Sequence, residues 1–181
     1  MEIRKTEFDE PEIIKLVILG AGGYGKTVLD LGNQLGYSCI VLDDKSSKPL
    51  SMYTSYISDS TYFIPAFGNN EFRMKWINQL ISSGCRLAIL IHPHAYVSPT
   101  ASIGKGCVIL PNASVGTDVI LGSGCIINLG AIVDHGCILE DGVHIAPGGI
   151  VKGDNRISSC TKVDSGEVIE ARKYFVGGKN E

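Results

Sequence analysis

The sequence predicts an N-terminal α/β domain of truncated Rossmann-like type, followed by a C-terminal left-handed parallel β-helix of hexapeptide repeats. The first half alternates strand-like and helix-like apolar patterns, with a glycine-rich turn after its first strand. From residue 96 onward, an aliphatic residue returns at every sixth position. We therefore expect two domains, covering residues 1–94 and 95–181.

Composition narrows the function classes. The chain of 181 residues has room for one domain or two small ones, and its net charge of -3 provides no general attraction to nucleic acid or an anionic membrane. No apolar run approaches the ~20 residues of a membrane helix, and the charged N-terminus does not resemble a secretory signal. The six cysteines form no C-x-x-C pair, so we expect a reduced, cytoplasmic protein.

The N-terminal half predicts a β-α-β unit, a polar loop and a second β-α-β unit. The predicted strands are 15–19, 38–42, 62–66 and 86–91, and the loop is 45–60. The first helix covers about 24–36. The second helix runs to Gly84 with an apolar side made of Phe72, Trp76, Ile77, Leu80 and Ile81.

A G-x-G-x-x-G motif lies between the first strand and the first helix, formed by Gly20, Gly22 and Gly25. Asp43 follows roughly 20 residues later, where a dinucleotide-binding fold holds a ribose. Such glycines let the backbone approach a phosphate, and the helix start offers free N–H groups to the anion. The alternative is a tight turn without a ligand, but the strand, the helix and the acidic strand end are all present.

The length of the α/β pattern disfavours a nicotinamide-linked dehydrogenase. A dinucleotide crevice uses two such halves in a six-stranded sheet, whereas the pattern here ends after four strands, near His92. One mononucleotide half suits a nucleoside diphosphate better than NAD. Several polar residues lie at or next to the carboxyl ends of strands, where an open α/β sheet binds its ligand: Asp43, Asp44, Lys45, Gly68 and Asn69.

The second half is a hexad repeat without gap or insertion. The aliphatic series is Val97, Ile103, Ile109, Val115, Leu121, Ile127, Val133, Leu139, Ile145, Val151, Ile157, Val163 and Ile169. Four positions later stands a residue that is small for most of the run: Ala101, Cys107, Ala113, Val119, Cys125, Ala131, Cys137, Val143 and Gly149. Each hexad makes one short strand and a corner, and three hexads make one triangular coil with both series inside. Three cysteines are thereby interior fillers without a catalytic or metal role.

The position before each aliphatic residue points outward, because strand side chains alternate. It is apolar in many coils: Val108, Ile120, Ile126, Ile132, Ile138 and Ile150. Soluble monomers avoid an exposed apolar patch of this kind, so we expect this face to be buried against another copy, in a homotrimer.

Two histidines occupy outward positions of the repeat. His135 stands in a corner, and His144 stands among the isoleucines, where we expect the subunit seam. A histidine suits general base catalysis, although a surface histidine and an interface histidine are the plain alternatives. Zinc needs about three protein ligands, and His92 and His94 precede the repeat, so we expect no metal.

The combination resembles the bacterial sugar acetyltransferases of the sialic acid O-acetyltransferase family. That family includes N-acetyltransferases that modify UDP-4-amino sugars in bacillosamine-type pathways. The matching stretches cover most of residues 15–154: ILGAGGYGKTVLDL, CIVLDD, FGNNEFRMKWINQL, LIHPHAYVSPTASIG and IVDHGCILEDGVHIAPGGIVKGD.

The resemblance implies acetyl-CoA-dependent transfer of an acetyl group to the amine of a nucleotide-linked amino sugar, in a homotrimer with active sites between subunits. It assigns sugar-nucleotide binding to the first domain and acyl transfer to the second. It implies that His135 is the general base, that His144 contacts the acetyl donor, and that the Gly153 N–H meets the thioester oxygen. Asn128 falls near the substrate nitrogen. The implied nucleotide contacts are Gly22, Gly23, Asp43, Asp44, Lys45, Gly68 and Asn69, and we expect Tyr24 of the glycine loop to contact the substrate as well.

The chain departs from the family pattern in places. Gly136 stands where amino-sugar members often carry the carboxylate that orients the base, which leaves Asp134 as the adjacent acid. Tyr24 replaces a frequent histidine in the glycine loop, as in the O-acetyltransferase branch. The usual Val-Gly-x-Pro-Ala-Lys tail and further coils are missing. Five basic residues either meet CoA phosphates or form a solvated face: Lys152, Arg156, Lys162, Arg172 and Lys173.

Two alternatives stay open from the sequence. One is O-acetylation of sialic acid or another surface-glycan sugar. The other is a sugar-nucleotide-binding trimer with little catalysis.

Overall fold

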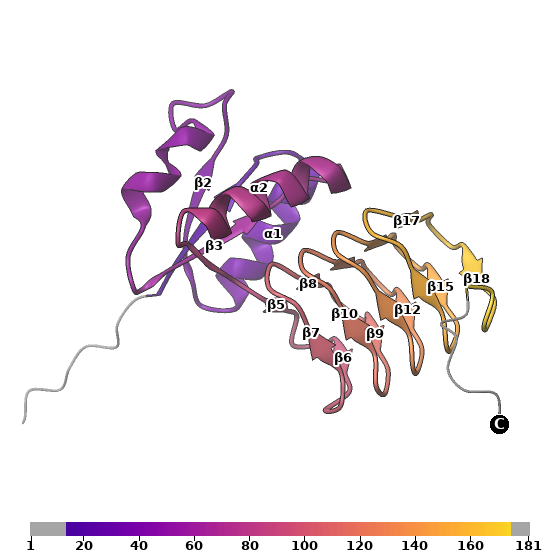
Figure 1. Ribbon diagram of the computed structural model, residues 1–181. Helices are drawn as coiled ribbons and strands as arrows, with labels where there is room; N and C mark the ends of the chain where they lie inside the picture. Colours follow the sequence, from indigo (N-terminus) through magenta and orange to yellow (C-terminus); the bar gives the residue numbers. More distant parts are fainter. Residues whose placement is uncertain (1–13, 175–181) are drawn as a thin grey trace, which may run out of the picture.

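The computed structural model describes residues 14–174. Figure 1 shows a parallel α/β sheet domain followed by short parallel strands in three stacked sheets, which together form a β-helix. The predicted fold class is therefore confirmed. None of the helices in the described range is long and apolar enough to cross a membrane.

The N-terminal sheet is parallel, with the strand order β2-β1-β3-β4. Its strands are β1 (Lys15–Leu19), β2 (Ser38–Leu42), β3 (Thr61–Pro65) and β4 (Arg86–Leu87). Helices α1 (Gly23–Gln34) and α2 (Asn70–Ser82) cover opposite faces. Alternate residues of β1 point to the two faces, so Ile18 packs with Val28 of α1 while Val17 packs with Ile77 of α2.

Two local predictions in this half were wrong. The loop expected at 45–60 contains a 3₁₀ helix, η1 (Leu50–Tyr56), because Leu50 and Tyr53 lie one 3₁₀ turn apart and are both buried. On α2, Phe72 and Ile81 were expected on the apolar side but are exposed.

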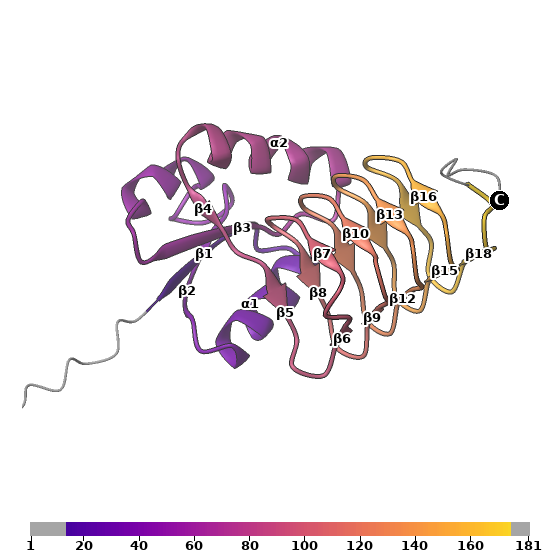
Figure 2. The ribbon, with the colours of Figure 1, turned by 60° about the horizontal axis from the view of Figure 1, so that its bottom comes forward.

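The repeat forms fourteen two-residue strands within the described range, stacked as parallel sheets (Figure 2). They are β5 (Leu90–Ile91), β6 (Tyr96–Val97), β7 (Ser102–Ile103), β8 (Val108–Ile109), β9 (Ser114–Val115), β10 (Ile120–Leu121), β11 (Ile126–Ile127), β12 (Ile132–Val133), β13 (Ile138–Leu139), β14 (His144–Ile145), β15 (Ile150–Val151), β16 (Arg156–Ile157), β17 (Lys162–Val163) and β18 (Val168–Ile169). Their orders are β17-β14-β11-β8-β5, β18-β15-β12-β9-β6 and β16-β13-β10-β7. The second residue of each strand belongs to one interior core, as the aliphatic series predicts.

The strand predicted at 86–91 is two strands in two different sheets. β4 pairs with β3, whereas β5 pairs with β8, so the repeat begins six residues before Val97, at Ile91. Between them, the Ala88 N–H donates to Phe63 O in the first sheet, and the Ala88 carbonyl accepts from the Gly106 N–H in the coils. The backbone therefore passes directly from one architecture to the other.

The outward apolar positions do not share one surface. Val108 and Ile126 are only 1% exposed within a single chain, because their sheet faces the N-terminal half, where Val108 packs in one cluster with Leu16 and Ile18. Their assignment to a surface between copies was therefore wrong. Ile120 and Ile132, on the other two sheets, are 48% and 39% exposed.

Side chains from the first turn of α2 bind the coil corners. Arg73, which is 1% exposed, donates from Nε to Gly124 O (2.9 Å) and from Nη2 to Gly142 O (2.8 Å). Asn70 Nδ2 donates to Cys160 O at 2.8 Å. These carbonyls lie 18 residues apart, one coil after another, so the two side chains form a ladder of hydrogen bonds along one edge of the coils. Figure 2 shows α2 along that edge.

Replacing Arg73 with Met is expected to lower the free energy of unfolding by about 3 kcal/mol or more. Two buried corner carbonyls then lose their hydrogen-bond donor, and each buried polar group without a partner costs about 1–3 kcal/mol of folding free energy. Urea unfolding measures the effect. Lys75→Met, on an exposed turn of the same helix, is the control and should change the free energy by less than about 0.5 kcal/mol. Equal effects of the two variants would contradict the ladder.

Candidate functional site

A cleft of about 1020 Å³ opens at the carboxyl ends of the N-terminal strands. Six of the predicted nucleotide-contact residues line it: Gly22, Gly23, Tyr24, Asp43, Gly68 and Asn69. Open parallel α/β sheets bind their ligands at this edge. The Asn69 side chain also caps α2, since its Oδ1 accepts the Phe72 N–H at 2.8 Å.

The glycine loop presents the start of α1 to this cleft. A side chain on Gly22 or Gly23 would meet nothing within 4 Å, so both positions are open to a ligand. Gly25 has a different role, because a Cβ there would collide with Gly20 O, and only glycine allows this close approach of helix and strand. The first turn of α1 contains no acidic residue, so its free N–H groups suit an anion such as a phosphate.

Asp43 holds the loop in place. Its carboxylate accepts hydrogen bonds from Ala21 N (2.8 Å) and Lys45 N (2.9 Å), and these bonds lower the pKa of Asp43. Asp44 turns away from the cleft: its Oδ1 accepts the Leu50 N–H, and it lines a neighbouring cavity of about 460 Å³. Lys45 is also absent from the residues that line the cleft in the described part of the chain.

Helix α2 and the turn before it contribute a wall of the cleft that the sequence did not predict. Phe67, Phe72 and Lys75 line the cleft, with the two phenylalanine rings edge-to-face at 4.6 Å between centroids. The signal was Phe72, an aromatic in the first turn of a helix, directly after the Gly68-Asn69 turn. Lys75 adds a cationic side chain to the cleft.

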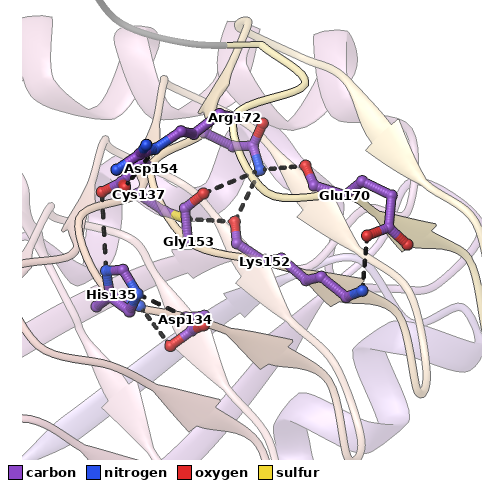
Figure 3. Close-up of polar contacts among 9 residues, drawn as sticks. Asp134, His135, Cys137, Lys152, Gly153, Asp154, Glu170 and Arg172 are labelled. Carbon is purple, nitrogen blue, oxygen red and sulfur yellow. Dashed lines mark hydrogen bonds and ion pairs between the residues drawn. The ribbon is translucent and has the colours of Figure 1, made fainter.

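His135 lies at a corner of the coils, between β12 and β13, and 60% of its side chain is exposed. Figure 3 shows the ring between two carboxylates. Asp134 Oδ1 accepts the His135 backbone N–H at 2.7 Å, and Asp134 Oδ2 lies 3.9 Å from ring Nε2. On the other side, Asp154 Oδ1 lies 3.7 Å from Nδ1.

Gly153 lies against the His135 ring. A Cβ at this position would be 2.6 Å from ring Cε1 and 2.7 Å from Nε2, so any larger residue would displace the ring. Within residues 14–174, the N–H of the buried Gly153 donates to no acceptor. Lys152 is engaged elsewhere, because its Nζ lies 2.6 Å from Glu170 Oε2.

His144 and Asn128 form a hydrogen-bonded pair. Asn128 Oδ1 accepts the Leu129 N–H at 2.9 Å, which turns its Nδ2 toward His144 Nε2 at 3.0 Å. Since an amide N–H donates, Nε2 is the unprotonated nitrogen and the proton of the neutral ring lies on Nδ1. Burial, with the nearby Arg73 and Lys162 charges, lowers the pKa of His144 to about 4, so the ring is neutral near pH 7.

Two buried side-chain atoms have no hydrogen-bond partner among the described residues: Tyr24 Oη and His144 Nδ1. Burial raises the pKa of Tyr24, so its hydroxyl keeps its proton. Both groups therefore carry a proton that no acceptor among the described residues takes. Within residues 14–174, no three His, Cys, Asp or Glu side chains are grouped so that they could hold a metal ion.

A single chain does not bring all the predicted residues together. His135, Asp134 and Gly153 gather at the corner after β12, whereas His144 lies on β14, in the sheet that faces the N-terminal half. The chain thus carries a nucleotide-sized cleft, a neutral histidine on the sheet of the coils that faces the N-terminal half, and an exposed histidine at a separate corner.

Known proteins are similar to this chain in sequence and fold. Residues 15–80 match the family model of the PglD N-terminal domain. The chain is 35% identical to the acetyltransferase domain of PglB from Neisseria gonorrhoeae FA1090 in complex with acetyl coenzyme A, with a TM-score of 0.81, over 86% of this chain and 82% of that one. It is 25% identical to PerB from Caulobacter crescentus in complex with CoA and GDP-perosamine, with a TM-score of 0.77, over 82% and 76% of the two chains.

A further relative is the UDP-N-acetylbacillosamine N-acetyltransferase of Bacillus subtilis (strain 168). It is 33% identical over an alignment of 110 residues that covers 52% of this chain and 50% of that protein. The match therefore spans about half the length of the Bacillus protein.

The neutral state of His144 predicts a pH-dependent stability. Its pKa is about 4 in the folded chain and near 6.5 when unfolded, so the unfolded chain binds more protons between these values. The free energy of unfolding should therefore fall as the pH is lowered from about 6.5 to about 4, and His144→Gln should flatten this slope. Urea unfolding at a series of pH values measures it, with the exposed His94→Gln as control. The same slope in all three proteins would contradict the assignment.

Proposed function

The chain belongs to the PglD-type sugar N-acetyltransferases of the hexapeptide acetyltransferase family, and on that premise we propose that it transfers the acetyl group of acetyl-CoA to the amine of a nucleotide-linked amino sugar. The observation that carries the proposal is the pairing of an anion-binding cleft with histidine-bearing coils, in a chain 35% identical to a domain that binds acetyl coenzyme A. The relatives named for bacillosamine and perosamine support an amino sugar, and we propose the UDP-4-amino type.

The cleft binds the sugar nucleotide in this proposal. The open glycines at the start of α1 and the Lys75 ammonium surround the diphosphate. A helix N-terminus and a cationic side chain both suit an anion of this kind. Phe72 offers an aromatic face in the same cleft, and Tyr24 lines the cleft at the start of α1. Asp43 keeps the loop in shape by binding Ala21 N and Lys45 N.

His135 is the proposed general base. Its Nε2 takes the proton that the sugar amine loses as the amine nitrogen attacks the thioester carbonyl, and such a base contributes roughly 10²–10⁴-fold to the rate. The carbon–sulfur bond then breaks, and the CoA thiolate leaves and is protonated. Asp134 holds the base through the His135 backbone N–H.

Two donors are available for the carbonyl oxygen of the acetyl group. The Gly153 N–H donates to no described acceptor, and the neutral His144 carries its proton on the unpartnered Nδ1. Asn128 acts on His144, because its amide holds Nε2 unprotonated. A fixed donor at a developing oxyanion is typically worth about 3 kcal/mol. Lys152 stays a proposed CoA contact, and it would have to leave Glu170 to meet a phosphate.

We further propose a homotrimer. His135 and His144 lie at different places on the coils, so a second copy has to bring one chain's His135 to another chain's cleft. Ile132, directly before this corner, is 39% exposed and suits such an interface.

The activity is tested by mixing the protein with acetyl-CoA and following free thiol. The acceptors are a UDP-4-amino sugar, a UDP-2-amino sugar, GDP-perosamine and sialic acid. Thiol release is expected with the UDP-4-amino sugar, and His135→Ala should lower kcat by roughly 10²–10⁴-fold. The exposed His94→Ala is the matched control and should leave kcat unchanged. Release only with sialic acid would favour O-acetylation, and no release with any acceptor would contradict the enzyme.

The trimer is tested by sedimentation. Ile132→Asp is expected to convert a wild-type trimer into monomers, because it buries a charge in an apolar interface. Ile81→Asp, on an exposed position of α2, makes the same chemical change away from the coils and should leave the trimer intact. A monomeric wild type, or a trimeric Ile132→Asp variant, would overturn the proposed assembly.

A further inference from the structure

The corner of the coils that carries His135 forms a column of residues one coil apart. Asp118, Gly136, Asp154 and Arg172 stand 18 residues apart and share one left-handed backbone conformation, with φ between 57° and 64°. They therefore stack at one edge of successive coils. His135 directly precedes the glycine of this column, so its ring lies next to the corner one coil later.

Asp154 occupies the space that glycine leaves free at position 136. A Cβ on Gly136 would lie 2.5 Å from Asp154 Oδ1, closer than real Cβ contacts allow. The two positions are thus coupled, because the missing side chain at 136 is what admits the carboxylate of Asp154 beside the His135 ring. Asp154 Oδ1 lies 3.7 Å from His135 Nδ1.

The Asp154 carboxylate is fixed by Arg172, on the side away from the His135 ring. Its Oδ2 accepts a hydrogen bond from Arg172 Nε at 3.1 Å, while the Arg172 backbone N–H donates to Gly153 O. The Asp154 N–H donates to His135 O at 3.0 Å, which ties the two corners together. Below them, the buried Asn155 side chain donates to the carbonyls of the preceding and following coil segments, Lys152 O at 2.7 Å and Glu170 O at 2.8 Å.

The other neighbouring acid meets the ring differently. Asp134 uses Oδ1 on the His135 backbone N–H, and its Oδ2 is 3.9 Å from Nε2, the nitrogen that acts as base in the proposed function. Asp154 is on the Nδ1 side. A carboxylate on Nδ1 favours the tautomer with a proton there and an electron pair on Nε2.

We propose that Asp154 is the positioning residue of His135, accepting the Nδ1–H so that Nε2 is free to take a proton. The catalytic consequence rests on the proposed function, whereas the tautomer does not. A movement of the ring or carboxylate of under about 1 Å brings the pair to hydrogen-bond distance, and catalytic hydrogen bonds commonly tighten in the substrate complex. When Nε2 accepts the proton, the Asp154 charge stabilises the imidazolium.

The first test is kinetic, in the full-length protein with acetyl-CoA and a UDP-4-amino sugar. Asp154→Asn keeps the shape and tolerates the left-handed backbone but removes the charge. It is expected to lower kcat by roughly 10–100-fold, the usual cost of losing a residue that orients a functional histidine, with KM nearly unchanged. Asp118→Asn changes the same corner position with the same backbone φ, two coils earlier, and should leave kcat unaltered.

A double variant separates positioning from a structural role. If Asp154 acts through His135, then adding Asp154→Asn to His135→Ala should produce no further loss of kcat. A further 10-fold loss in the double variant, or equal effects of Asp154→Asn and Asp118→Asn, would overturn the assignment.

The second test needs no substrate. Nitrogen-15 shifts of the His135 ring are expected to show the Nδ1–H tautomer in the wild type and in Asp118→Asn, and a shift toward Nε2–H in Asp154→Asn. An unchanged tautomer in Asp154→Asn would refute the proposal. If no acceptor is acetylated by the wild type, the proposed function fails, and the ring shifts still decide the role of Asp154.

Discussion

Hydrogen bonds from the first turn of α2 to the coil corners fix the two halves of the molecule relative to each other. Arg73 and Asn70 donate to three carbonyls spaced one coil apart: Gly124, Gly142 and Cys160. The Arg73 guanidinium also donates to Phe67 O, in the wall of the cleft. One buried cation therefore connects the cleft to the coils, and the rise of the coils sets the position of the cleft. The acceptors are backbone carbonyls, and two of these corners are glycines at which a Cβ would collide with Ile77 or Met74, so the connection also requires small corners at Gly124 and Gly142.

The same cation also influences the chemistry beside the cleft. Its charge adds to burial in lowering the pKa of His144, which keeps that ring neutral, and Asn128 then assigns the single proton to Nδ1. The protonation state of this histidine therefore depends in part on the cation that α2 places against the coils. Val108 and Leu110 of the coils pack in one cluster with Leu16 and Ile18 of the sheet domain, which adds an apolar contact between the two halves.

Periodicity predicted the fold well, because a hexad repeat requires one residue type at one depth in every coil. The same periodicity could have located the first coil, since Ile91 lies six residues before Val97. It could not distinguish an outward position that meets the N-terminal half from one that meets solvent, and so it misassigned Val108 and Ile126. Nor does an apolar pattern reveal a buried arginine: Arg73 is charged, and its partners are carbonyls 51 and 69 residues away.

The partner of His135 was out of reach for a related reason. Along the sequence, the neighbours of His135 are positions 134 and 136, where a histidine in an isolated turn would find its carboxylate. In a β-helix, a side chain also meets residues one coil, or 18 positions, later. The carboxylate beside Nδ1 of His135 belongs to Asp154, which is 19 positions further along the chain. Gly136 therefore does more than remove a carboxylate next to His135 in sequence. Because it has no side chain, the Asp154 carboxylate can occupy the space beside it. In a β-helix, therefore, a site is specified by columns of corners, and a change at one corner is best interpreted together with the residues one coil above and below it.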